Sequence, residues 1–516
     1  MIVVFHKNNK VVQIYDYTAA TELFVAGNTM QQVLINVAKK NNDFIGWSHI
    51  SLKKEIDLNN WRTIFKHQLI MASFEISKNY FIDDSIGFVE DTPFINVNKK
   101  VNYPTWLMSS DVGGIHASVL LKFEWLLQYK FSFSYFLNSV SKIGMKQGLL
   151  CYSNPKLLKS LNFKFKPINK EISKTDLLWF IKSNYRFRWV LLYLFNAFIY
   201  KKETLIFPFL KVLFKKSIAN TVSLKDIKLI DKNKLKPPTI DVLIPTLGRE
   251  KYLKDVLIDL AEQTLLPKKV IIVEQNPNIN KRSELHFLSD EWPFKINHIF
   301  IHQLGACNAR NIALQKVTSD WVFFADDDIK FKNNTLENAF KYISLYNAKA
   351  VTISCLRKKE QEKTTIIKQW NTFGTNASIV NYDFVANIKF DLAYEFGYGE
   401  DADFGMQLRN NGIDILYVPF VKMIHIKAPV GGFREKFKQE WEYETLQPKP
   451  SPTIMLFKLK YATKEQLQGY KTILFFKFYK FQPIKNPYKY IKIMNKRWGK
   501  SMYWANFLIK KHSNEI

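Results

Sequence analysis

The chain has 516 residues, of which 47% are hydrophobic and 15% aromatic, so global disorder is excluded and two or three domains with their own cores are expected. Its formal net charge of +29 favours a polyanionic partner, such as nucleic acid, an anionic membrane face or a diphosphate-bearing substrate. The three cysteines are widely spaced and form no metal-ligand pair, which indicates reduced thiols in a cytosolic protein. We expect neither a secretory signal nor a membrane-spanning segment, because no apolar run approaches the roughly 20 residues that a bilayer requires.

Residues 1–162 contain a faint copy of the pattern found between residues 305 and 417. Three stretches match in the same order: 27–50 with 305–328, 114–119 with 374–379, and 136–152 with 404–417. The matches predict an internal duplication of one α/β fold, with chance similarity of two α/β patterns as the alternative.

The first copy lacks acidic residues at the corresponding positions. Ser48 and His49 stand where the second copy has carboxylates, and residues 132–135 contain no acid. We therefore predict a non-catalytic first domain that binds acceptor or serves as a scaffold. His49 is expected to be a core or turn histidine rather than a metal ligand.

Two further regions, residues 163–236 and 441–516, are basic, aromatic and expected to be helical. Within the first, residues 186–202 and 205–216 are apolar stretches flanked by Lys or Arg. The second carries similar clusters between residues 475 and 504. Such stretches suit a monotopic contact with a membrane surface. Helices packed between domains would have the same composition.

Residues 237–440 alternate strands and helices in the manner of a largely parallel α/β domain. A polar linker that contains two adjacent prolines, residues 231–240, precedes them. Strands are expected at 241–246, 270–273, 321–325 and 350–354, and helices at 252–263, 308–316 and 334–346. Strand–helix–strand units of this length are right-handed and parallel, so ligands are expected at the carboxyl ends of the strands.

The most informative stretch is an apolar strand, residues 321–325, that ends in Asp326, Asp327 and Asp328. Unpaired carboxylates are costly beside a core, and three adjacent ones repel one another unless a cation lies between them. A hard divalent metal takes oxygen ligands and commonly bridges protein carboxylates to substrate phosphates. The stretch therefore predicts a metal held against a diphosphate. A simple turn, or an Asp that caps the following helix, is the alternative.

Four more motifs accompany this acidic turn in order along the chain. They are a strand and loop at 241–249, a strand at 270–276 that contains Glu274, the sequence Gly-Ala-Cys-Asn-Ala-Arg-Asn at 305–311, and Glu400-Asp401 within 399–404. This ordered set, over about residues 239–435, resembles the family 2 glycosyltransferases, inverting enzymes with the GT-A fold. The resemblance implies a Rossmann-like mixed sheet for residues 237–440. Glu274 takes the place of the Asp that usually reads the base in this family, which leaves the base open.

The resemblance also implies a metal site and a donor site. The metal, Mn²⁺ or Mg²⁺, is expected to bind Asp326, Asp328 and His425, although a lone histidine is more often structural. The donor, expected to be a UDP-sugar, would contact Pro245, Thr246, Arg249, Glu274, Asn276, Arg310, Asn311, Asp326, Asp327 and Arg434. Arg310 could instead be an ordinary surface arginine. Gly431 and Gly432 suit a hinge that lets Arg434 close over the diphosphate.

Asp401 is the expected catalytic base, and Glu400 is expected to help orient the acceptor or the base. An acceptor hydroxyl that attacks the anomeric carbon needs a carboxylate within hydrogen-bond reach. Acids at a helix start are also favoured by the helix dipole, and the two roles are compatible.

The expected function is transfer of one sugar, with inversion, to a hydroxyl of a glycan or lipid-linked acceptor during surface polysaccharide synthesis. Processive extrusion is not expected, because the Gln-x-x-Arg-Trp signature is missing. The enzyme would be cytoplasmic and peripheral on the inner membrane face. Alternatives are a bifunctional polymerase with two active domains, a nucleic-acid-binding protein, for which no recognisable motif is present, and a scaffold without activity.

Overall fold

The computed structural model describes residues 1–77, 80–162, 171–218, 222–229, 238–429 and 437–512. The chain forms two compact units. The first contains residues 1–230 and 462–473, and the second contains residues 231–461 and 474–516. The boundary near residue 231 falls on the polar linker expected from the sequence.

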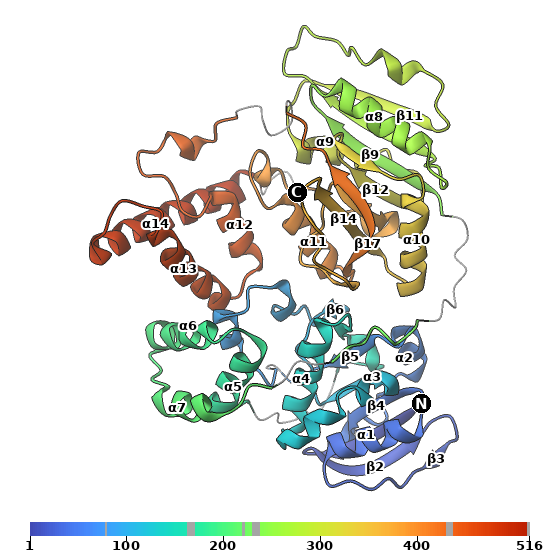
Figure 1. Ribbon diagram of the computed structural model, residues 1–516, viewed down its shortest axis with the longest axis vertical. Coiled ribbons are helices and arrows are strands. Elements are labelled where there is room, and N and C mark those ends of the chain that lie inside the picture. Colours follow the sequence, from blue (N-terminus) through green and yellow to red (C-terminus); the bar gives the residue numbers. More distant parts are fainter. Residues whose placement is uncertain (78–79, 163–170, 219–221, 230–237, 430–436, 513–516) are drawn as a thin grey trace. The chain divides into compact units, whose positions relative to one another are not determined.

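The second unit is built on a mixed sheet with the strand order β11-β10-β9-β12-β16-β14-β17-β13, and β15 pairs with β17 (Figure 1). Its strands are β9 (Ile240–Thr246), β10 (Lys269–Gln275), β11 (Lys295–Ile301), β12 (Trp321–Ala325), β13 (Ile329–Phe331), β14 (Ala350–Arg357), β15 (Lys368–Gln369), β16 (Ala377–Asn381) and β17 (Ile415–His425). Its first helices are α8 (Glu250–Ala261), α9 (Ala306–Leu314), α10 (Thr335–Tyr346) and α11 (Glu400–Asn410). The strands and helices expected for residues 241–354 are thus confirmed, with ends that differ by a few residues.

Strands β9, β10, β11 and β12 run parallel, so their carboxyl ends lie at one edge of the sheet. The strand β16 runs antiparallel to β12 and β14, which makes the sheet mixed. The ring of Phe324 on β12 lies 5.1 Å from that of Phe373 and 5.7 Å from that of Phe404 on α11. This aromatic packing anchors the start of α11 beside the carboxyl end of β12.

The first unit has its own sheet, ordered β3-β2-β1-β4-β7-β5-β8-β6. The strands are β1 (Ile2–Lys7), β2 (Lys10–Asp16), β3 (Thr21–Glu22), β4 (Phe44–His49), β5 (Ile70–Phe74), β6 (Tyr103–Pro104), β7 (Val112–His116) and β8 (Leu150–Ser153). The helices packed with it are α1 (Met30–Lys40), α2 (Leu58–Ile64), α3 (Ala117–Leu121) and α4 (Phe133–Met145).

The central strands of the two sheets share order and direction. In the first unit β1-β4-β7-β5-β8 runs with β4 parallel to β1, β7 antiparallel to both neighbours, and β8 parallel to β5. The series β9-β12-β16-β14-β17 repeats each of these relations. The next strands differ, because β2 is antiparallel to β1 whereas β10 is parallel to β9. This shared order supports the proposed duplication. The first and third sequence matches fall on equivalent elements, whereas the second aligns residues 117–119 of α3 with residues 377–379 of β16.

The region predicted as a helical linker is helical but packs into the first unit. It forms α5 (Lys174–Asn184), α6 (Arg188–Asn196), the π-helical turn η6 (Ala197–Lys201) and α7 (Ile206–Phe214). Leu177, Phe180, Tyr193 and Val212 join the same buried cluster as the sheet residues Val4 and Met71. The hydrophobic core of the first unit therefore extends past residue 162.

The C-terminal region is helical, as expected, and is divided between the units. It consists of α12 (Pro452–Tyr461), α13 (Lys464–Tyr479) and α14 (Pro487–His512), and α13 contributes its first part to the first unit. There Gln466 donates hydrogen bonds to the carbonyls of Glu90 and Thr92. Across the described ranges, no helix combines the length and apolarity needed to cross a membrane.

Candidate active site

A cavity of about 530 Å³ opens at the carboxyl ends of β9, β10 and β12, where the fold leads one to expect ligands. Its wall includes Pro245, Thr246, Arg249, Gln275, Gly305, Arg310, Asp326, Asp327, Asp328, Glu395, Phe396, His425, Lys427 and Phe437. Eight of the residues predicted for donor or metal binding, including His425 at the C-terminal end of β17, thus share one cavity.

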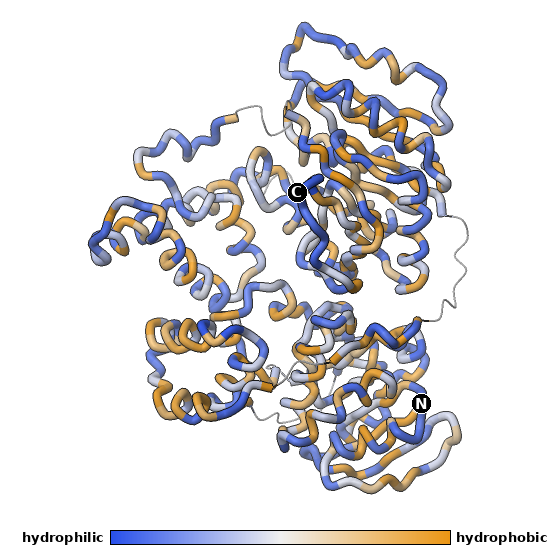
Figure 2. Tube along the Cα trace, viewed as in Figure 1, coloured by the Kyte–Doolittle hydropathy of each residue, from blue (hydrophilic) through white to orange (hydrophobic). Residues whose placement is uncertain are grey.

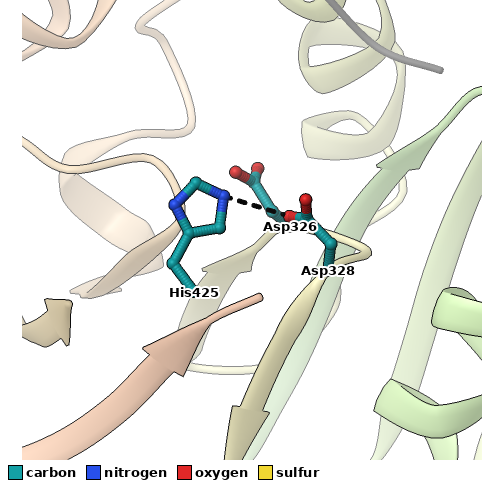
Figure 3. Close-up of side chains that lie close together, drawn as sticks. All are labelled: Asp326, Asp328 and His425. Carbon is teal, nitrogen blue, oxygen red and sulfur yellow. Dashed lines mark ion pairs between the residues drawn. The ribbon is translucent and has the colours of Figure 1, made fainter. Parts of the chain in front are cut away.

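Asp326, Asp328 and His425 form a cluster in this wall (Figure 3). One potential ligand atom from each lies within 4.8 Å of the others, and His425 Nε2 is 3.3 Å from Asp328 Oδ1. The short strand β13 pairs antiparallel with β17 and sets Ile329 opposite His425, which brings the imidazole to the acidic turn. Two carboxylates and an imidazole are a donor set that fits a divalent cation.

Charge and hydrogen bonding hold Asp328 ionised. Burial raises the pKa of Asp328, but the bonds from His425 and from the Ala428 amide, at 2.8 Å, outweigh it and hold the pKa below its ordinary value. The same carboxylate raises the pKa of His425. The Ile426 amide also donates to the Asp328 carbonyl at 2.8 Å. The segment after β17 is therefore fastened to the acidic turn.

Asp327 is fully engaged by neighbouring side chains. Its carboxylate accepts hydrogen bonds from Thr246 Oγ1 at 2.7 Å and from Arg249 Nη1 at 2.6 Å, and burial raises its pKa to about 6. These contacts tie the acidic turn to the loop after β9. Asp327 positions this part of the site, and Arg249 also lies 3.4 Å from Asp328.

Arg310 is buried, so the alternative of an ordinary surface arginine was wrong. The side chain is 6% exposed, and its Nη2 lies 3.2 Å from Asp326 Oδ1. Among the described residues, its Nε and Nη1 atoms are buried without a hydrogen-bond partner. Burial raises the pKa of both Glu400 and Asp401, and the charge of Arg310 partly opposes this rise. Arg310 therefore pairs with the acidic turn, is close enough to act electrostatically on the acids at the start of α11, and has two further donors available for a ligand.

Glu400 and Asp401 begin α11 after Gly399, whose φ of +119° is a conformation that favours glycine. Asp401 Oδ1 accepts hydrogen bonds from the amide and the hydroxyl of Thr375, at 3.3 and 2.6 Å. Burial raises the pKa of Asp401, and burial together with the charge of Asp401 raises the pKa of Glu400 to about 7. Among the described residues, the cavity wall does not extend to this pair.

Three residues predicted to bind the donor lie outside the cavity wall and have protein partners. Glu274 accepts from His298 Nε2 at 2.8 Å, and Asn276 accepts from the Asn278 amide at 3.0 Å. The amide of Asn311 is bonded at both ends to the backbone of Phe390, at 2.7 and 2.8 Å. Their roles in nucleotide binding stay predictions. Arg434 and the glycines before it lie outside the described residues.

Two cavity residues were not foreseen from the sequence. Glu395 accepts hydrogen bonds from the Cys307 and Asn308 amides at the start of α9, at 3.2 and 3.0 Å. Gln275 accepts from the Gly305 amide at 2.6 Å. Gly305 has φ +139°, and a Cβ there would lie 2.4 Å from the Glu395 carboxyl carbon. The glycine that opens the motif at 305–311 therefore makes room for Glu395.

Comparison with known proteins agrees with this geometry. The model for glycosyl transferase family 2 matches residues 241–397, which hold the cavity strands, Arg310 and the acidic turn. Residues 241–397 are a family 2 glycosyltransferase domain. The mixed sheet of this glycosyltransferase unit accordingly has the GT-A fold expected from the motifs.

Individual relatives match different shares of the chain. The poly(ribitol-phosphate) beta-N-acetylglucosaminyltransferases TarS of Staphylococcus aureus strains Mu50 and MW2 are 25% identical over 115 residues, which is 22% of this chain and 20% of each relative. The match thus spans about a fifth of these relatives. A crystal structure of S. aureus TarS 1–349 with UDP-GlcNAc aligns with 52% of this chain and 81% of that one, at 16% identity and a TM-score of 0.38. The complex with UDP aligns with 37% and 61%, at 19% identity and a TM-score of 0.32.

Proposed function

We propose that the glycosyltransferase unit moves one sugar from a nucleotide-diphosphate sugar to an acceptor hydroxyl, with inversion at the anomeric carbon. The observation that carries this proposal is the cluster of Asp326, Asp328 and His425 beside the buried Arg310. Arg310 Nη2 lies 3.2 Å from Asp326 in the carboxylate and imidazole cluster, and the charges of Glu400 and Asp401 also act on this guanidinium. The first group suits a departing diphosphate, and the second suits an attacking hydroxyl.

Asp326, Asp328 and His425 are proposed to hold a divalent cation. When bound, such an ion supplies Lewis-acid stabilisation of the charge that develops on the diphosphate. The imidazole favours Mn²⁺ over Mg²⁺, because Mg²⁺ strongly prefers oxygen ligands in octahedral geometry. Asp327 and Arg249 contribute by holding the acidic turn in one conformation.

Arg310 is proposed to bind the diphosphate or the donor sugar. Its Nε and Nη1 lack a hydrogen-bond partner among the described residues, and buried donors of this kind favour an anionic ligand. Pro245, Thr246 and Arg249 form the loop side of the same cavity. The donor is proposed to be a UDP-sugar.

Asp401 is proposed to take the proton from the acceptor hydroxyl. The two hydrogen bonds from Thr375 fix one carboxylate oxygen and leave the other for the hydroxyl. Burial raises the pKa of Asp401, which makes it a stronger base than an exposed aspartate. Glu400 is proposed to orient the acceptor.

The acceptor is proposed to be a glycan or a lipid-linked saccharide of a surface polymer. A second cavity of about 240 Å³ shares Leu304, Glu395, Phe396 and Phe437 with the donor cavity. Its far wall has Trp441 and, from α14, Trp504 and Phe507. Aromatic walls with a few polar groups suit a saccharide. The TarS relatives are named for poly(ribitol-phosphate), and the net charge of +29 favours a polyanionic acceptor here as well.

We further propose that the protein works in the cytoplasm at the inner face of the membrane, as a peripheral enzyme. A bifunctional polymerase has less support, because the last two residues of β4 in the first unit are Ser48 and His49 instead of acids. His49 accepts a hydrogen bond from the Ser51 amide at 3.3 Å, as a turn histidine does. The first unit is proposed to be a non-catalytic acceptor-binding or scaffolding domain.

The direct test is donor hydrolysis by the full chain with UDP-, GDP- and dTDP-sugars, each with Mn²⁺ or Mg²⁺. Wild-type protein should release nucleoside diphosphate from one donor class, whereas Asp328→Ala and Asp401→Asn should not. Asp255→Ala removes an exposed acid on α8 and is the matched control. Full activity of both site variants, or no turnover of any donor, would refute the proposed chemistry.

A further inference from the structure

The helices α6 and α7 and the turn η6 present an apolar surface to solvent. Phe198 is 62% exposed, Phe207 80% and Phe214 88%. Further exposed members between residues 187 and 214 are Phe187, Leu191, Phe195, Ile199, Ile206, Leu210 and Leu213. Figure 2 shows these helices as predominantly hydrophobic along their length. We refer to residues 187–214 as the α6–α7 surface.

Packing of the first unit does not account for this surface. Val190, Tyr193 and Ala197 face inward, and Val212 is the buried residue of α7. The helix α5 holds α7 by its C-terminal end, because Lys182 donates hydrogen bonds to the carbonyls of Val212 and Lys215. A helix could satisfy these contacts with polar residues on its outer face. Contiguous exposed apolar residues on this scale mark a site of interaction.

Basic residues surround the apolar ones. Residues 186–216 contain seven Lys or Arg and a single acid, Glu203. Arg186, Arg188, Lys202, Lys211 and Lys216 are exposed. Glu203 lies 3.4 Å from Lys174 of α5, so it offsets a charge outside the surface. The α6–α7 surface therefore combines exposed aromatic side chains with a net positive charge.

We infer that the α6–α7 surface docks on an anionic lipid bilayer. A bilayer accounts for both components, because acyl chains accept the Phe, Leu and Ile side chains while anionic headgroups attract the Lys and Arg rim. The nine residues of α7 are about 14 Å long, roughly half the hydrocarbon thickness, so the helix lies in the interface plane. A protein partner would be expected to meet a rim with charges of both signs.

This docking rests on the proposed peripheral location and names the surface responsible, but it is independent of the sugar chemistry. The α6–α7 surface belongs to the first unit, whereas the donor cavity belongs to the second, and binding to vesicles is measured without donor or metal. Failure to bind vesicles would contradict the docking and the proposed peripheral location but would leave the proposed sugar transfer intact. Failure to turn over a donor would leave the docking proposal intact.

The test uses the full chain and co-sedimentation with two kinds of vesicle, phosphatidylcholine alone and phosphatidylcholine with 30% phosphatidylglycerol. Wild-type protein should bind the anionic vesicles at least about tenfold more tightly than the neutral ones. The triple variant Phe198→Glu/Phe207→Glu/Phe214→Glu should lose about 100-fold or more in affinity. Lys211→Gln/Lys216→Gln should lose about tenfold and should make the remaining binding less sensitive to salt.

The matched control is Phe24→Glu/Ile279→Glu, since these side chains are 93% and 72% exposed and lie far from residues 187–214 in sequence. It should bind vesicles like wild type, and all variants should keep the wild-type melting temperature. Equal binding to both vesicle types, or unchanged binding by the Phe→Glu variant, would overturn the inference. So would a wild-type dimer in ultracentrifugation that the Phe→Glu variant converts to a monomer without any vesicle binding, because the occupant would then be a second copy.

Discussion

The central strands of the two sheets have the same arrangement, but different residues follow the equivalent strands β4 and β12. In both units a buried parallel strand, β4 or β12, lies between a parallel neighbour and an antiparallel one. The β12 strand ends in Asp326, Asp327 and Asp328, which face a basic residue, Arg310, and an imidazole, His425. The β4 strand ends in Ser48 and His49, which are bonded within their own turn. The difference teaches that chemistry in this architecture depends on a few residues at one strand end.

The largest expected effect is on kcat/KM, and it should differ between substitutions at the carboxyl ends of β12 and β4. Asp328→Ala should lower kcat/KM for sugar transfer by about 10³-fold, because it removes a proposed metal ligand and the anchor of the Ala428 amide. The change Ser48→Ala at the β4 tip should alter kcat/KM by less than about threefold. Steady-state kinetics over a range of Mn²⁺ concentrations would check both. Comparable losses of kcat/KM for the two variants would contradict this contrast, because residues after both β4 and β12 would then contribute to catalysis.

The second contrast is between the first turns of the equivalent helices α11 and α4. Asp401→Asn at the start of α11 should lower kcat by about 10²- to 10³-fold with little change in donor KM, because it removes the proposed base but not the donor site. Ser134→Ala in the first turn of α4 should leave kcat unchanged. A kcat for Asp401→Asn within a few-fold of wild type would exclude Asp401 as the base.

A third contrast concerns the pKa of a buried glutamate in each unit and its effect on the free energy of unfolding. In the first unit Glu90 pairs with Lys142 and accepts from Tyr185, and despite burial these partners lower its pKa. Glu90→Gln should therefore cost about 3 kcal/mol of unfolding free energy at pH 7, because it leaves Lys142 buried without its counter-ion. The cost should shrink as the pH falls through the pKa of Glu90 and wild-type protein also loses the charge.

Denaturant unfolding at several pH values would measure this cost, and the double variant Glu90→Leu/Lys142→Met should recover much of it. Glu400→Gln in the second unit should have the opposite sign. The pKa of Glu400 is raised to about 7, so its charge disfavours the folded state above that pH and the variant should be slightly stabilised there. Equal destabilisation by both variants would contradict the contrast.

The smallest expected effect is on the pH profile. If Glu400 and Asp401 must be ionised, kcat/KM should fall about tenfold per pH unit below pH 7, in line with the pKa of about 7 for Glu400. Glu400→Gln should move this limb to lower pH, because loss of the neighbouring charge lowers the pKa of Asp401. Profiles from pH 5.5 to 8.5 would show it, and an identical limb in the variant would argue against the pairing.

Much of this site could be predicted from local sequence. The alternation of apolar strands and amphipathic helices gave the right elements for residues 241–354, because each element has its own periodicity. Asp326 and Asp328 follow a strand directly, and His425 joins them through the pairing of β13 with β17. Glu395 had no such signal, since it contacts α9 from a loop more than 80 residues downstream. The sharing of α13 between units was equally hidden, because Gln466 reaches Glu90 across 376 positions of sequence.

The pairing of Ile329 with His425 places a strict limit on how this protein can vary. Side chains along a strand alternate between the two faces of the sheet, so inserting or deleting one residue after Ala325 would shift β13 by one place against β17. The imidazole would then stand opposite a side chain of the other face, and the carboxylates would lose it. Descendants of this chain should therefore tolerate changes of residue type in the turn far better than changes in its length.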